Sequence, residues 1–188
     1  SSMLREYEKL GDVNVKIIAF DDTARVAPWY NGDTQSAIDF IYGLAPGAGT
    51  YYDEALMGLI NDTAANAAPA ADHNLIYFIS DGDPNADHGL DSTVAYDSLT
   101  GVPAWEKFVT DHADKAYAIG LGAGVDLTSL RPVAYPNTNS DEFAISVTNE
   151  SQLAQTLLST VTAGVAQGSS VLVDASSGAG GGKFGADG

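Results

Sequence analysis

The chain has 188 residues, of which 45% are hydrophobic, and this length and composition suit one domain with a sizeable core. Its 25 acidic residues outnumber 8 basic ones and give a formal net charge of -17, so nucleic acid and anionic membranes are poor partners. There is no cysteine, which excludes disulfides and thiolate metal sites, and no apolar run approaches the ~20 residues that insertion across a membrane requires.

Hydrophobic spacing and turn-forming residues predict helices and strands that alternate along the chain. In chain order these are the last turns of a helix within 1–10, a strand at 14–20, a short edge strand at 24–28, a helix capped by Asp33 or Thr34, a helix after 47–50, a strand at 74–79, a helix at 103–113, a strand at 115–121, a short helix from Asp126 to 130, a strand at 143–147 and a helix that begins near Asn149. Such alternation implies parallel strands joined by crossover helices.

The strand at 74–79 is the most informative of these elements, because it stops abruptly at acidic and turn-forming residues. Leu75 to Ile79 are apolar without interruption, as in a strand whose sheet is covered by helices on both sides. Gly82 and Pro84 then turn the chain. In open α/β sheets ligands bind beyond the carboxyl ends of the parallel strands, so Asp81 is expected where such folds place their chemistry.

A second segment, Gly47 to Thr50, is a glycine-rich loop that ends in a hydroxyl residue and opens a helix. Together with Ile79-Ser80-Asp81-Gly82 it resembles the von Willebrand factor A domain, of the type found in large secreted bacterial RTX-like adhesins. The resemblance covers residues 1–167, because the strands at 14–20 and 115–121 also follow the family's order. It implies an α/β fold with a doubly wound, mainly parallel, Rossmann-like sheet, helices on both faces and one antiparallel edge strand.

The resemblance also implies a metal-ion-dependent adhesion site, to which Thr50 and Asp81 are the matching residues. Hydroxyl and carboxylate oxygens are hard ligands, which favour Mg²⁺, Ca²⁺ or Mn²⁺ over zinc. In the family an acidic group of the ligand, here a protein or glycan, completes the coordination of the metal, so the site binds and does not catalyse. The chain is therefore expected to be a cell-adhesion module at the extracellular surface, beside neighbouring domains of a larger protein.

One departure from the family concerns its first strand, whose Asp-x-Ser-x-Ser motif supplies the primary metal ligands. No such segment precedes Asp12, so the chain is expected to begin inside the domain and the sheet to lack its first central strand. Each unpaired backbone group in such a gap would cost about 1–3 kcal/mol. Either upstream residues or another segment must therefore fill it.

Residues 170–178 are an internal candidate for the gap, because an apolar strand there runs into Asp-x-Ser. If this segment closed the sheet, Asp174 and Ser176 would be metal ligands, although Gly178 stands where the family has its second serine. The simpler interpretation, which we prefer from the sequence, treats residues 168–188 as a glycine-rich tail or the start of a following module.

Two functions from other classes remain open. A metal-assisted hydrolase would use Asp81 or Asp83 on the metal and His88 as acid or base. A structural spacer would hold no metal. A looser calcium contact by Asp83 or Asp87, and a contribution of the Asp21-Asp22 pair to the same edge of the sheet, are further alternatives.

Overall fold

The computed structural model describes residues 2–45, 47–90, 102–136, 142–162 and 169–176. Within these ranges the helices are α1 (Ser2–Glu8), α2 (Thr34–Tyr42), α3 (Tyr52–Ala65), α5 (Val102–His112), α6 (Leu127–Leu130) and α7 (Glu150–Thr162). The strands are β1 (Asn14–Phe20), β2 (Ala24–Val26), β3 (Tyr30–Asn31), β4 (His73–Ser80), β5 (Lys115–Leu121), β6 (Ala144–Val147) and β7 (Ser169–Ser176). The predicted α/β alternation is confirmed, and β3 is an addition too short to leave a periodic pattern.

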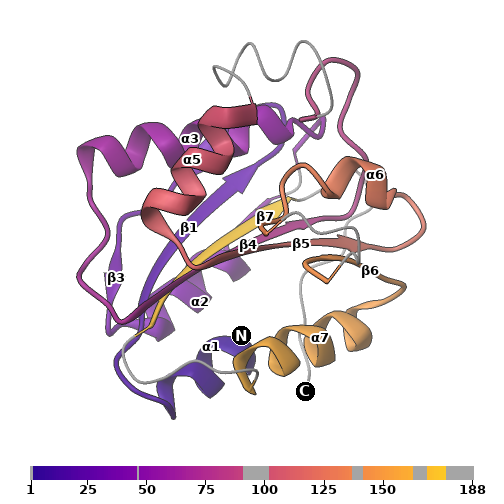
Figure 1. The fold of residues 1–188 in the computed structure, drawn as a ribbon. Coiled ribbons are helices and arrows are strands. Elements are labelled where there is room, and N and C mark those ends of the chain that lie inside the picture. The colour runs from indigo at the N-terminus through magenta and orange to yellow at the C-terminus, as the bar shows by residue number, and fades with distance from the viewer. Residues whose placement is uncertain (1, 46, 91–101, 137–141, 163–168, 177–188) are drawn as a thin grey trace.

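Helices cover the sheet on both sides. Residues 15–20 of β1 and 75–80 of β4 are all buried. Successive side chains of a strand point to opposite faces, so uninterrupted burial means that neither face meets solvent there. Figure 1 shows the two layers responsible, with α3 and α5 on one side of the sheet and α1 and α7 on the other.

The strands form two groups that a seventh strand joins. β4, β5 and β6 pair in parallel, whereas β1 pairs in antiparallel fashion with β2 and β3. β7 pairs in parallel with both β1 and β4. The order across the resulting sheet is β2-β1-β7-β4-β5-β6, with β3 beside β1, and the yellow β7 is visible between β1 and β4 in Figure 1.

The position of β7 corrects the expectation that the sheet lacks a central strand. Val173 of β7 lies opposite both Ile17 of β1 and Tyr77 of β4, so β7 occupies the slot between them. Its backbone groups pair with two strands that would otherwise be unpaired in the interior, which is the physical reason for the placement. The internal candidate from the sequence supplies this strand. Residues 177–188 of the expected tail lie outside the described ranges.

Buried hydroxyl groups connect the sheet to two helices on one face. The Tyr77 hydroxyl of β4 lies 2.6 Å from the Tyr7 hydroxyl of α1 and 2.6 Å from Oγ1 of Thr160 on α7. Burial raises the pKa of Tyr7 to about 12 and also raises the pKa of Tyr77, so both phenols stay neutral. This network holds α1 and α7 against the centre of the sheet.

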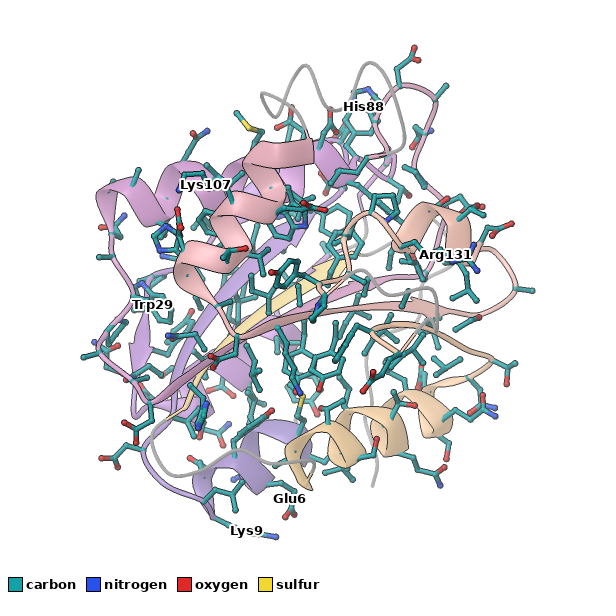
Figure 2. The ribbon with its side chains drawn as sticks, viewed as in Figure 1. Glu6, Lys9, Trp29, His88, Lys107 and Arg131 are labelled. Carbon is teal, nitrogen blue, oxygen red and sulfur yellow. The ribbon has the colours of Figure 1, made fainter. Side chains whose placement is uncertain are left out.

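Glu6 and Lys9 are examples of charged side chains at the outside of the molecule. Glu6 and Lys9 project from α1 and its C-terminal turn in Figure 2, with 2.5 Å between Oε1 and Nζ. Exposed ion pairs of this kind contribute about 0–1 kcal/mol to stability.

Among the helices in the described ranges, none combines the length and the apolar character needed to cross a bilayer.

Candidate metal centre

Three loops meet at the carboxyl edge of the parallel strands. They are residues 21–23 after β1, residues 47–51 before α3, and residues 81–88 after β4. The amide of Tyr51 donates to the carbonyl of Asp21 over 2.9 Å, and the amide of Asn85 donates to the carbonyl of Thr50 over 2.9 Å. The loop that carries Thr50 is therefore held between the other two.

The two predicted metal ligands, Thr50 and Asp81, belong to loops in contact. A Cβ atom at Gly82 would lie only 3.3 Å from Oγ1 of Thr50, so this hydroxyl faces the residue directly after Asp81. Thr50 is 8% exposed. Its hydroxyl oxygen at this edge is a candidate ligand for a hard cation.

The turn that carries Asp81 is fixed by several hydrogen bonds. Ser80 Oγ and the Tyr52 hydroxyl each donate to the carbonyl of Gly82 over 2.8 Å. The amide of Asp83 donates to the carbonyl of Gly124, beyond β5, over 2.9 Å. Burial raises the pKa of Tyr52, so its phenol remains protonated and can donate. Asp81 is thus placed by a rigid turn, because the neighbouring backbone is tied to α3 and to the loop after β5.

Asp21 has a structural role at this edge. Its Oδ1 accepts hydrogen bonds from the amide and hydroxyl of Thr23, and its Oδ2 lies 2.9 Å from Nη1 of Arg25. Burial by itself raises the pKa of Asp21, but the hydrogen bonds from Thr23 and the charge of Arg25 outweigh it and leave the pKa below its ordinary value. The Asp21 carboxylate is therefore charged and already engaged within the protein.

Gly47 packs directly on that carboxylate, which gives a first prediction. A Cβ at Gly47 would lie 1.9 Å from Oδ2 and 2.5 Å from Cβ of Asp21. Because Asp21 is buried and held on both oxygens, Gly47→Ala should displace the loop and lower the free energy of unfolding by about 1–3 kcal/mol, measured by urea denaturation. Gly43→Ala is the matched control, since its Cβ would meet only ordinary contacts at 3.4 Å. Equal stability of the two variants would contradict the prediction.

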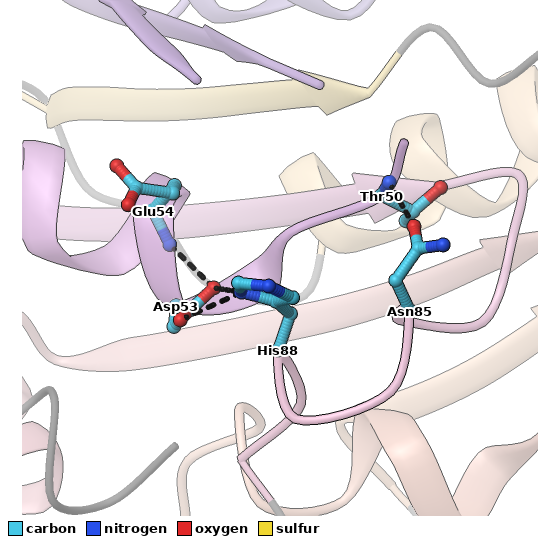
Figure 3. A network of polar contacts seen from close by, with 5 residues as sticks. All are labelled: Thr50, Asp53, Glu54, Asn85 and His88. Carbon is cyan, nitrogen blue, oxygen red and sulfur yellow. Dashed lines mark hydrogen bonds and ion pairs between the residues drawn. The ribbon is translucent and has the colours of Figure 1, made fainter. Parts of the chain in front are cut away.

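His88 lies beside Asp53 at the start of α3, as Figure 3 shows. Its Nδ1 is 3.0 Å from both carboxylate oxygens of Asp53, which is 7% exposed. Its ring stacks on Tyr51 with 3.4 Å between ring centroids. The amide of Asp53 donates to the carbonyl of His88 over 3.2 Å. These contacts fix the far end of the loop that follows β4.

The remaining acidic residues of the sequence prediction are spread along the same edge. Oδ1 of Asp83 accepts the amide of Asp126, which caps α6, over 2.9 Å. Asp87 is exposed and has a left-handed backbone with φ of 69°, and Asp22 is exposed as well. Asp83 therefore ties the loop after β4 to the loop before α6, and a calcium contact by Asp83 or Asp87 stays a prediction.

The donor chemistry of the edge fits a hard divalent cation. Thr50 offers a hydroxyl and Asp81 a carboxylate, and Mg²⁺ is commonly bound through one or two carboxylates while it keeps several waters. No group of three or more His, Cys, Asp or Glu side chains that could hold a metal occurs in the described part of the chain. β7 ends at the same edge, with Ser176 opposite Phe20 and Ala175 opposite Ile79.

Sequence reasoning missed the residues that hold the two loops together. The amide of Asn85 donates to the Thr50 carbonyl, and Oδ1 of Asn85 accepts the Thr50 amide. The carboxylate of Asp53 pairs with the His88 ring. Neither belongs to the motifs that identified Thr50 and Asp81. The only signal in the sequence is the polar character of the loop after β4, which does not specify the partner of any side chain.

Comparison with known proteins adds no family assignment. A scan against protein-family models finds no match to this chain, and a search of curated proteins finds no similar sequence.

Proposed function

We propose that this protein is a divalent-cation-dependent binding module of the von Willebrand factor A type, which acts in adhesion at the extracellular surface. The observation that supports this function most directly is the approach of the Thr50 hydroxyl to Gly82, the residue after Asp81. A hydroxyl and a carboxylate from separate parts of the chain thereby reach one edge of the sheet.

The arrangement of the strands also supports a site at this position. β1, β2 and β3 lie on one side of β7, and β4, β5 and β6 lie on the other. In doubly wound sheets, ligands bind beyond the carboxyl ends of the strands where the strand order reverses direction. The loops with Thr50 and Asp81 flank that point, which favours a doubly wound, von Willebrand A-like fold.

We further propose that β7 contributes ligands to the same cation. Asp174 stands in register with Ile18 and Phe78, and the strand continues to Ser176 beside Phe20. Asp-x-Ser at the end of a central strand is the partial motif that the family uses for its primary ligands. In this proposal the cation, Mg²⁺ or Ca²⁺, supplies an electrophilic centre for a carboxylate of a protein or glycan ligand.

The proposal predicts that the cation stabilises the folded chain. A ligand present at 100 times its dissociation constant stabilises a protein by about 2.7 kcal/mol, which for a chain of this size raises the melting temperature by several degrees. Thermal melting should therefore shift upward when MgCl₂ or CaCl₂ replaces EDTA. Thr50→Val, which removes the hydroxyl and keeps the side-chain volume, should lose this shift.

Two matched variants separate ligation from folding. Thr50→Ser keeps the hydroxyl and should keep most of the shift, whereas Asp81→Asn should lose it, because the amide is a weaker ligand than the carboxylate. Asp174→Asn should lose it as well if β7 carries a ligand. A cation response that survives in both Thr50→Val and Asp81→Asn would overturn the site.

The hydrolase alternative finds no specific support in the geometry. It would require Nε2 of His88 to act beside a metal on Asp81 or Asp83, because Asp53 holds Nδ1 of His88 and the amide of Asp126 holds Oδ1 of Asp83. These contacts join His88 to α3 and Asp83 to the start of α6, and they do not bring His88 and Asp83 together. The same titration decides the spacer alternative, because the melting temperature of a metal-free spacer would be the same in EDTA, in MgCl₂ and in CaCl₂.

A further inference from the structure

Asn85 hydrogen-bonds both backbone groups of Thr50, the residue that carries the proposed hydroxyl ligand. Oδ1 of Asn85 accepts the amide of Thr50 over 2.6 Å, and the amide of Asn85 donates to the carbonyl of Thr50 over 2.9 Å, as seen in part in Figure 3. A Cβ at Gly49, where φ is +93°, would lie 3.6 Å from the same Oδ1. The Asn85 side chain therefore lies over the Gly49-Thr50 peptide.

The loop that carries Asn85 is also anchored to the residues that follow Thr50. The amide of His88 donates to the carbonyl of Asn85 over 3.0 Å, which closes a turn. The His88 ring is in turn held by the Asp53 carboxylate and by stacking on Tyr51. Asn85 thus reaches Thr50 from a turn whose other end is fixed to the first residues of α3.

We infer that Asn85 is a positioning residue of the proposed cation site, which orients the Thr50 hydroxyl toward the Asp81 turn. The inference rests on the proposed function. Thr50 follows Gly47 and Gly49, and glycine restrains the backbone least. The hydrogen bond to Oδ1 supplies a restraint that the loop itself lacks, and partners of ligating residues typically change metal affinity about 10–100-fold when they are removed.

A purely structural role predicts a different outcome from a positioning role. Asn85 is exposed, and Asn85→Ala keeps the backbone bond from residue 85 to the Thr50 carbonyl. The fold should therefore change little in EDTA, whereas the orientation of Thr50 should become less defined. The expected signature is a loss of cation affinity without a matching loss of melting temperature.

The test is a titration of the whole chain with Mg²⁺ and with Ca²⁺. Cation binding is measured by isothermal titration calorimetry, and stability is measured by thermal melting. Asn85→Ala should bind the cation about 10-fold more weakly or worse. Asn85→Asp, which keeps an acceptor oxygen, should restore binding to at least the level of the unaltered chain. Asn149→Ala is the matched control, because Asn149 also accepts a backbone amide, that of Gln152 over 3.0 Å, and lies at the start of α7. It should leave cation affinity unchanged.

A second readout does not need the metal. In EDTA, the Thr50 amide should exchange with solvent faster in Asn85→Ala than in the unaltered chain, because its acceptor is gone. Equal cation affinity of Asn85→Ala and the unaltered chain would overturn the inference and leave the proposed function intact. If the unaltered chain responds to neither cation, the proposed function fails and the inference with it. If Asn85→Ala does not fold, weaker cation binding by Asn85→Asp than by the unaltered chain overturns the inference.

Discussion

Removing residues 169–176 should abolish the cooperative unfolding transition of this protein. β7 pairs with β1 along Asn14 to Phe20 and with β4 along His73 to Ile79, so its loss leaves a gap in the middle of the sheet. Each buried backbone group without a partner costs about 1–3 kcal/mol. Ten such groups would exceed the 5–15 kcal/mol by which ordinary proteins are stable, on that order-of-magnitude estimate.

Two chains that differ only in β7 provide the measurement. A chain that ends at residue 176 should melt cooperatively, and a chain that ends at residue 168 should show no transition in circular dichroism. Leu172→Pro in the whole chain should act like the shorter chain, because proline removes a backbone donor from a central strand. A cooperative transition of the 168-residue chain near that of the longer one would show that β7 is dispensable.

Replacing Asp62 by alanine should lower the free energy of unfolding by about 3–5 kcal/mol. Lys16 on β1 is 2% exposed, and its Nζ lies 2.5 Å from Oδ2 of Asp62 on α3. The same ammonium group is 5.7 Å from the centre of the Trp29 ring. Without Asp62, the Trp29 ring would be the remaining partner of this buried charge among the residues that the structure describes. Urea denaturation of the variant gives the loss directly.

A double substitution distinguishes a lost charge partner from lost packing. Lys16→Met combined with Asp62→Leu removes both charges and should restore most of the stability, because apolar side chains replace a buried ion pair at little cost. Asn66→Ala measures the separate contribution of the 2.9 Å bond between Asn66 Nδ2 and Asp62 Oδ1. If the double variant is as unstable as Asp62→Ala, the burial of an unpaired charge is not the cause.

Local patterns predicted the individual strands well and their assembly incompletely. The strands at 14–20 and 115–121 have the predicted limits, because continuous apolar runs end there at polar or turn-forming residues. The helix expected within residues 1–10 ends at Glu8, and Leu10, which follows it, is 36% exposed.

The location of β7 could not be deduced from its own residues. The apolar run at 170–174 predicts a strand, but it does not say which strands lie beside it in the sheet. Its pairing with β1 and β4 depends on the backbone groups of those two strands that would otherwise be unpaired. Lys16 illustrates the same limit, because a single lysine in an apolar strand reads as a position facing solvent. Lys16 is buried because Asp62 of α3 and Trp29 approach it in the folded chain.

The candidate site shows a similar division. The glycine loop and the end of β4 identified Thr50 and Asp81, and the structure brings these two segments together. Asn85, Asp53 and Tyr52 act through hydrogen bonds that exist only after the loops have approached one another. Their roles depend on tertiary distance, which sequence spacing does not encode. Metal binding by the edge stays a prediction that the titrations decide.

The position of β7 in chain order has a consequence for synthesis. β1 and β4 leave the ribosome before the strand that separates them in the finished sheet, so a nascent chain carries two open edges that cannot yet meet. Exposed strand edges are templates for pairing with other molecules, and contacts between distant segments form slowly. Productive folding therefore waits for the last strand, and newly made chains should be most prone to aggregation just before it emerges.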